Sequence, residues 1–228
     1  MNPKQKSQIQ ENLLSLYLRL NGYFVTGFIV HSPDHGRVAT EIDVLGVRFP
    51  YSREPERLVE PDALLNLSPS KIELVICEVK SQGKPLQFNQ ALLDSPERVA
   101  SIIRWAGLYQ EESIEKLALE VYESFKTESL RRDCPPTVDH QGNTRIRGLL
   151  CSPERLNRRD NQAWFISGEM QFNFIFQCLC PDNPRATCAT RYDFGQWGEY
   201  ENIVRYFKSR VGNNCGGIND LYEFYEQL

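Results

Sequence analysis

Long apolar runs are missing from this 228-residue sequence. No stretch approaches the roughly eighteen consecutive apolar residues that a membrane-spanning helix needs, and the N-terminus is amphipathic rather than uniformly apolar. The seven cysteines make an odd count in a chain with no secretory signal, which favours reduced thiols over a disulfide framework. We therefore expect a cytoplasmic protein that does not contact a membrane.

An excess of positive charge is also missing. The 26 Lys and Arg residues are outnumbered by 30 Asp and Glu residues, so the formal net charge is −4 at pH 7. A general polyanion-binding protein would show the opposite balance, so nucleic acid would need a local basic surface or a partner subunit. The composition, with 41% hydrophobic and 25% charged residues, is that of a folded globular domain and not of a disordered chain.

Hydrophobic periodicity predicts an alternation of helices and strands. Apolar positions three and four residues apart predict a first helix at residues 8–20. Residues 23–31 and 38–49 predict an antiparallel hairpin, and the apolar run at residues 72–80 is typical of a central, doubly covered strand. A further strand is expected at residues 145–151, and helices are expected at residues 86–93, 96–108, 112–125, 165–179, 202–209 and 220–227.

This order of elements predicts an α/β fold with a mixed central β-sheet flanked by helices. The core should span residues 1–151 and contain an inserted loop at residues 50–70, which is rich in proline and charge. Residues 152–228 should form a mainly helical C-terminal extension packed on the same domain.

Two carboxylates and a lysine stand in strand segments that are otherwise hydrophobic. Asp43 lies in the second strand of the hairpin, and the predicted central strand ends in Glu78-Val-Lys80. Because residues two apart in a strand face the same side, Glu78 and Lys80 should project together. If the two strands are neighbours, Asp43 reaches the same point.

Carboxylates gathered in this way repel each other unless a cation lies between them. Hard oxygen ligands of this kind suit Mg²⁺ or Mn²⁺ better than zinc. A metal held there could polarise a phosphodiester and lower the pKa of a bound water. Lys80 would then orient the attacking water or offset the charge that develops on the phosphate.

The order of helix, hairpin with an Asp in its second strand, strand ending in Glu-x-Lys, and helix resembles the PD-(D/E)XK nucleases, the restriction-endonuclease-like superfamily. The resemblance covers roughly residues 8–93. It implies that Asp43, Glu78 and Lys80 take the three signature catalytic positions. It also implies that the backbone carbonyl of Val79 joins Asp43 and Glu78 as a metal ligand.

Two accessory positions follow from the same resemblance. Many members of the superfamily carry a Glu on the first helix, and Glu11 occupies the matching place here. Some branches also carry a Gln on the helix that follows the lysine, for which Gln90 is the candidate and Gln87 the alternative.

The family motif has a proline before its first aspartate, where this sequence has Ile42. Literal Pro-Asp pairs occur at Asp34 and Asp62 instead. Asp34 lies in a predicted turn, and Asp62 is expected in the first turn of a short helix, where an acidic residue complements the helix dipole. We therefore place the metal ligand at Asp43 and keep Asp62 as its competitor.

Arginines crowd the middle of this acidic chain. Because the guanidinium fork matches phosphate oxygens, they are candidates for a nucleic-acid-binding surface beside the active site. A solvated face of scattered arginines explains the same pattern equally well. The candidates are Arg131, Arg132, Arg145, Arg147, Arg158 and Arg159.

The sequence thus predicts a metal-dependent nuclease, endo- or exonucleolytic, that hydrolyses phosphodiester bonds in DNA or RNA, and the resemblance to the superfamily favours DNA. Bacterial defence or repair is the setting implied by the resemblance alone. The alternative is a catalytically inactive nuclease-fold module that binds a protein or nucleic acid. The expected partners are nucleic acid and, given the acidic charge, a recruiting protein subunit or a second copy of the chain in a homodimer.

Overall fold

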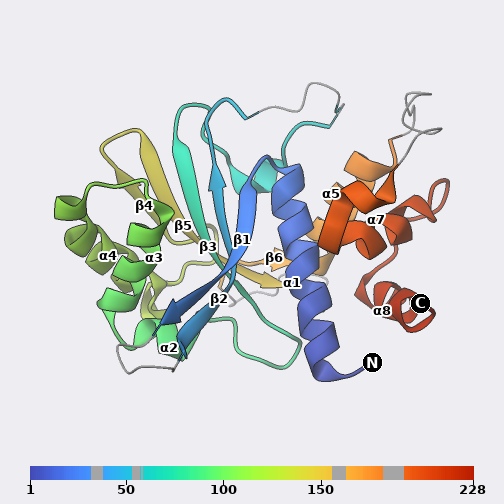
Figure 1. Cartoon of the computed structure of the whole chain (residues 1–228), viewed down its shortest axis with the longest axis horizontal. Helices are drawn as coiled ribbons and strands as arrows, with labels where there is room; N and C mark the ends of the chain where they lie inside the picture. Colours follow the sequence, from blue (N-terminus) through green and yellow to red (C-terminus); the bar gives the residue numbers. More distant parts are fainter. Residues whose placement is uncertain (32–37, 53–56, 58, 156–162, 182–192) are drawn as a thin grey trace.

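The computed structural model describes residues 1–31, 38–52, 57, 59–155, 163–181 and 193–228 (Figure 1). In these residues, six strands form one mixed sheet with helices packed against both faces. The predicted α/β fold with a helical C-terminus is therefore confirmed. None of the described helices combines the length and the apolar character needed to cross a membrane.

The predicted hairpin and central strand are both present. The hairpin strands pair antiparallel, the second of them pairs antiparallel with the central strand, and the central strand β3 pairs parallel with β5. A short strand that periodicity did not predict, β4, lies at the edge beyond β5. The strands are β1 (Phe24–His31), β2 (Val38–Arg48), β3 (Ile72–Val79), β4 (Thr137–His140), β5 (Thr144–Ser152) and β6 (Ile166–Ser167).

The predicted helices are all found, with two of them shortened at their N-termini. The α-helices are α1 (Pro3–Leu20), α2 (Gln90–Leu93), α3 (Pro96–Ala106), α4 (Glu111–Phe125), α5 (Gly168–Leu179), α7 (Glu201–Lys208) and α8 (Ile218–Glu226). Short 3-10 helices occur at η1 (Ala63–Leu65), η2 (Thr127–Ser129) and η3 (Phe194–Tyr200).

Capping side chains explain the shortened helices. The side chain of Asn89 accepts a hydrogen bond from the amide of Ala91, so α2 begins at residue 90 rather than 86. Ser167 caps α5 in the same way through the amide of Met170, while residues 166–167 pair with β5. Residues 166–167, which were expected in the helix at residues 165–179, therefore belong to the sheet instead.

Two hydrophobic cores fill the space between the sheet and its helices. The C-terminal helices α5, α7 and α8 share the first core with α1, and the Tyr17 and Phe174 rings meet edge to face at 5.3 Å between centroids. Helices α3 and α4 cover the second core, where Phe88 stacks on Phe125 at 4.2 Å. Figure 1 shows these two helical layers on opposite sides of the strands. The C-terminal extension is thus part of the packing around the sheet.

Candidate functional site

The ladder between β2 and β3 leads directly to the predicted site. It runs from the pair Arg48 and Glu73 to the pair Val44 and Cys77, and the next residues on the two strands are Asp43 and Glu78. The pairing of β1 with β2 shifts by one residue at the same place, so that Asp43 and Val44 lie opposite Gly27. Such a β-bulge redirects side chains and is common beside active sites.

The bulge brings Asp43 to the end of β3. Its Oδ2 atom accepts a hydrogen bond from the backbone N–H of Val79 at 2.7 Å. Strand β3 ends at Val79, one residue before Lys80. The Asp43 carboxylate is therefore fixed against the Glu-Val-Lys segment, as the sequence predicts.

Glu78 and Lys80 do project together. The Lys80 ammonium donates to Oε1 of Glu78 at 2.6 Å, and both side chains are largely buried. The backbone of Lys80 is clamped to the end of β5, because its N–H donates to the Cys151 carbonyl at 2.8 Å and its carbonyl accepts from the Ser152 hydroxyl at 2.6 Å. The lysine is thus held rigidly at the edge of the sheet.

Burial shifts the acidity of both carboxyl groups. It raises the pKa of Glu78 from 4.5 to about 7, with a further rise from the charge of Asp43. Lys80 and the backbone N–H of Asn89 act in the opposite direction without offsetting this rise. Burial also raises the pKa of Asp43, against the lowering effects of the Val79 amide and Lys80. The site holds more negative charge than its single lysine neutralises.

Two further glutamates belong to the same electrostatic cluster. Glu11 on α1 accepts a hydrogen bond from the Ser7 hydroxyl at 3.0 Å, and its pKa is raised by burial and then by the charge of Asp43. Exposed Glu41, which the sequence reasoning missed, raises the pKa of both Asp43 and Glu11. Its place two residues before Asp43 on the same strand was the signal that would have identified it.

The accessory glutamine is not joined to the cluster by any hydrogen bond in the described residues. Gln90 is exposed, and its side-chain amide lies 3.4 Å from the carboxylate of Asp94 on the same short helix. The neighbouring Asn89 contributes its backbone N–H to Glu78 instead. Every residue except proline carries a backbone N–H, so the residue type at position 89 could not identify this donor.

Asp62, the competitor for the first ligand position, lies at the other end of the sheet. Its Oδ2 accepts from the Tyr17 hydroxyl at 2.6 Å, and its Oδ1 caps η1 through the amide of Leu64 at 3.0 Å. Both oxygens thus have structural partners, and it is Asp43 that meets β3 beside Glu78. Asp34 lies outside the described residues.

The predicted arginine surface does not form as a unit. Arg147 is only 3% exposed and pairs with buried Glu73, so its guanidinium is not available to a nucleic-acid phosphate, and the prediction is corrected for this residue. Arg145 pairs with Glu73 and Asp139 at the same end of the sheet. Both face away from the candidate site because β5 runs parallel to β3 and carries them beside Glu73.

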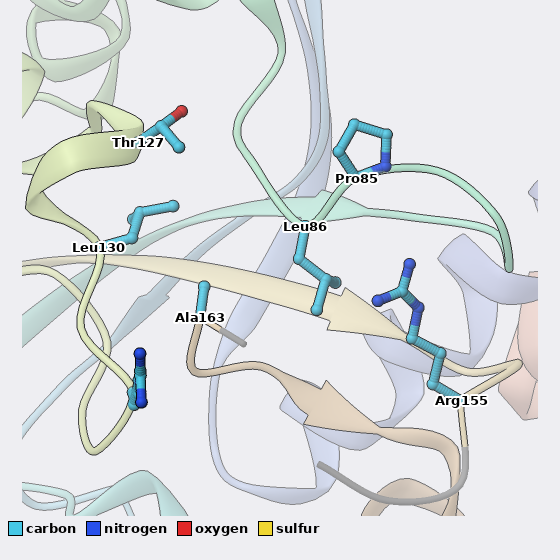
Figure 2. A pocket seen from close by; sticks show the side chains of 7 residues that line it. Pro85, Leu86, Thr127, Leu130, Arg155 and Ala163 are labelled. Atoms are coloured by element: carbon cyan, nitrogen blue, oxygen red, sulfur yellow. The ribbon is translucent and has the colours of Figure 1, made fainter. Parts of the chain in front are cut away.

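The remaining candidate arginines divide into two groups. Arg131 and Arg132 are exposed in the segment after η2. Arg132 lines a cavity of about 440 Å³ together with Arg155, beside the loop that follows Lys80 (Figure 2). Arg158 and Arg159 lie outside the described residues.

A larger groove, of about 1370 Å³, lies where α1 ends and the 50–70 segment begins. Neither this groove nor the smaller cavity is lined by Asp43, Glu78 or Lys80. The acidic cluster lies where the ladder between β2 and β3 ends, apart from both of these cavities.

The donor chemistry of the cluster fits a divalent cation in part. Among the described residues, no three His, Cys, Asp or Glu side chains are gathered as a metal site would require. The predicted ligand set is smaller, with two carboxylates and the Val79 carbonyl. Those hard oxygen donors, with an excess of negative charge, are the kind that Mg²⁺ and Mn²⁺ bind.

Comparison of this chain with protein-family models, with curated proteins and with solved structures gave no match. The functional assignment therefore stands on the geometry of the site.

Proposed function

We propose that this protein is a Mg²⁺- or Mn²⁺-dependent nuclease that hydrolyses phosphodiester bonds, in DNA before RNA. The observation that carries the proposal is the pairing of Glu78 with Lys80 at 2.6 Å next to Asp43, in a buried cluster where the pKa of Glu78 is raised to about 7. A carboxyl group perturbed in this way, beside a like charge, is typical of a functional site.

Asp43, Glu78 and the backbone carbonyl of Val79 would hold the metal. A bound divalent ion would polarise the scissile phosphodiester and make hydroxide available near neutral pH. Glu78 must lose its proton to serve as a ligand, so cation binding and Glu78 ionisation are linked. The nearby negative charges of Glu11 and Glu41 add to the attraction for a cation.

Lys80 supplies the positive charge of the site. Its ammonium lies at the end of the central strand, next to the predicted ligands, where it can orient a water or offset charge that develops on the phosphate. Its backbone bonds to Cys151 and Ser152 fix that position in advance. Preorganised charge is effective in catalysis because it needs no rearrangement during the reaction.

The test is a cleavage panel with plasmid, single-stranded and double-stranded oligonucleotides in Mg²⁺, Mn²⁺ or EDTA. We expect cleavage that requires metal and that falls by about a hundredfold or more in Lys80→Ala. Lys116→Ala, which changes an exposed lysine on α4, is the matched control and should retain the wild-type rate. Cleavage by Lys80→Ala at the wild-type rate would disprove the assignment.

A second candidate is a nuclease-fold module that binds a protein or nucleic acid without cleaving it. The formal net charge of −4, which disfavours general binding to a polyanionic substrate, favours this function. Calorimetric titration with Mn²⁺ separates the two. A nuclease should bind Mn²⁺ in a manner that Asp43→Asn abolishes, whereas an inactive module should show no binding that depends on Asp43.

A further inference from the structure

A basic cavity lies beside the loop that connects Lys80 to α2. Its walls come from three segments distant in sequence: the loop after β3, the segment around and after η2, and the two residues that flank positions 156–162. Figure 2 shows Leu86 and Pro85 above β5, Thr127 and Leu130 on one side, and Arg155 on the other. The lining residues are Pro85, Leu86, Thr127, Leu130, Arg132, Arg155 and Ala163, around a volume of about 440 Å³.

The described residues give these walls positive charge. Arg132 and Arg155 line the cavity and no described Asp or Glu does, although acidic residues outnumber basic ones in the chain. The Arg155 guanidinium donates to the carbonyl of Lys84, a neutral partner. Arg132 is exposed and forms no ion pair with the described residues. Two guanidinium groups that have no carboxylate partner among the described residues favour an anion.

The rest of the lining is apolar or neutral. Leu86, Leu130 and Ala163 supply hydrocarbon surface, and Thr127 adds one hydroxyl. A volume of this size falls within the range of roughly 300–1,000 Å³ that is typical of small-molecule sites. The lining therefore favours a ligand with a weakly polar body and an attached oxyanion.

We propose that this cavity binds one nucleotide of the substrate strand, with its two flanking phosphates at Arg132 and Arg155 and its base against Leu86 and Leu130. The proposal rests on the proposed nuclease function, since it assigns a substrate subsite to that site. Phosphate contacts of this kind position a nucleic acid, and contact with the base adds selectivity.

The cavity lies at the same end of the sheet as the catalytic cluster. Pro85 and Leu86 belong to the loop that follows Lys80. The Lys80 N–H donates to the Cys151 carbonyl at the end of β5, and Arg155 just after β5 donates to the Lys84 carbonyl. A nucleotide held at Leu86 would thus lie beside the loop that supports the catalytic residues. The subsite would hold the strand close to the scissile phosphate.

The test measures binding without cleavage. A fluorescently labelled oligodeoxynucleotide is titrated in EDTA by anisotropy, with folding checked by thermal melting. We expect the double variant Arg132→Gln with Arg155→Gln to weaken binding by about tenfold or more and to lower the salt dependence. The matched control, Arg104→Gln with Arg205→Gln, removes the same charge from α3 and α7 and should bind like wild type.

A second variant separates the cavity from its charge. Ala163→Phe fills the space and keeps both arginines, and we expect it to weaken binding as well. Normal binding by Ala163→Phe, or equal weakening in the control double variant, would overturn the proposal in favour of a general charge effect. Tight binding of a deoxynucleoside monophosphate without binding of the oligonucleotide would also overturn it, because the site would then serve free nucleotides.

Failure of the nuclease function gives a different result. Absence of metal-dependent cleavage with cavity-dependent binding intact would disprove the nuclease and leave a nucleotide-binding site. Cleavage that is unaffected by the Arg132 and Arg155 changes, with binding also unaffected, would disprove the subsite alone.

Discussion

Strand β3 carries two buried glutamates, one at each end, and their surroundings differ sharply. Glu73 is fully buried and accepts hydrogen bonds from the Tyr23 hydroxyl at 2.8 Å and the Ser68 amide at 3.0 Å. Two arginines, Arg145 and Arg147, lie within 4 Å of its oxygens. Its charge is surrounded by donors and cations contributed by three different segments.

Glu78 is 5% exposed and has a poorer environment. Lys80 and the amide of Asn89 are its partners, while the like charge of Asp43 opposes its ionisation. Burying a charge costs free energy unless it is paired, so a carboxylate left in this state needs another reason to be retained. The comparison indicates a structural role for Glu73 and a functional role for Glu78 on the same strand. The substitutions below test this difference.

The largest effect is expected from Glu78→Gln. The substitution keeps the shape of the side chain but removes a charged ligand, so metal-dependent cleavage should fall by about a hundred- to a thousandfold. Stability should not fall, and above pH 7 it should rise, because the ionised glutamate is only weakly compensated. Plasmid cleavage rates and urea unfolding would be measured together. A variant that cleaves within a few fold of wild type would remove Glu78 from the site.

The corresponding change at the other end should act on stability. Glu73→Gln leaves the guanidinium of Arg147 buried without its anionic partner, which is expected to cost about 3 kcal/mol. Urea unfolding measures the loss, and cleavage by the folded protein should stay within a few fold of wild type. If Glu73→Gln instead removed cleavage at unchanged stability, the division between the two ends of β3 would be wrong.

Local sequence patterns were enough to predict the acidic cluster. The alternation of side chains places Glu78 and Lys80 together, and the apolar lead-in to Glu78 indicates a central strand. The short connection of the hairpin makes its two strands neighbours. With β2 next to β3, Asp43 falls beside Glu78. The bulge that turns its carboxylate toward Val79 depends on the pairing with Gly27, and nothing in the local sequence encodes that shift.

The arginine surface could not be predicted correctly because the partners of these residues are set by long-range strand pairing. Arg145 and Arg147 lie more than seventy positions from Glu73 in the sequence, and their partner is fixed only when β5 adds parallel to β3. An Arg that neutralises a buried carboxylate and one that meets solvent look alike in sequence. Strand β4 was not predicted for a related reason. A short edge strand with half-exposed residues shows little hydrophobic periodicity.

The third prediction concerns pH. The pKa of Glu78 is raised from 4.5 in the unfolded chain to about 7 in the folded one, so the folded state binds more protons between these values. Its contribution to the free energy of unfolding is present below about pH 4.5 and is lost as the pH rises through 7, a change of about 3 kcal/mol. Thermal melts in EDTA from pH 5 to 8 should show this decline, which Glu78→Gln should reduce.

Metal should reverse the decline if the cluster is its site. Added Mn²⁺ binds the ionised carboxylates, so it should raise the melting temperature more at pH 8 than at pH 5.5. A rise that is equal at both pH values, or that persists in Asp43→Asn, would mean that the ion binds elsewhere.

The smallest effect is expected at Glu41, at the exposed edge of the cluster. Its charge acts on Asp43 and Glu11 through space, and water and salt screen it. Glu41→Gln should therefore weaken Mn²⁺ binding by only about two- to threefold, and the difference should vanish in high salt. Glu120→Gln on α4 removes an exposed charge that does not act on Asp43, Glu78 or Glu11, and it should leave Mn²⁺ affinity unchanged. A loss as large as that of Asp43→Asn would instead make Glu41 a direct ligand. The cluster of poorly neutralised carboxylates at the end of β3 would then include this exposed residue of β2.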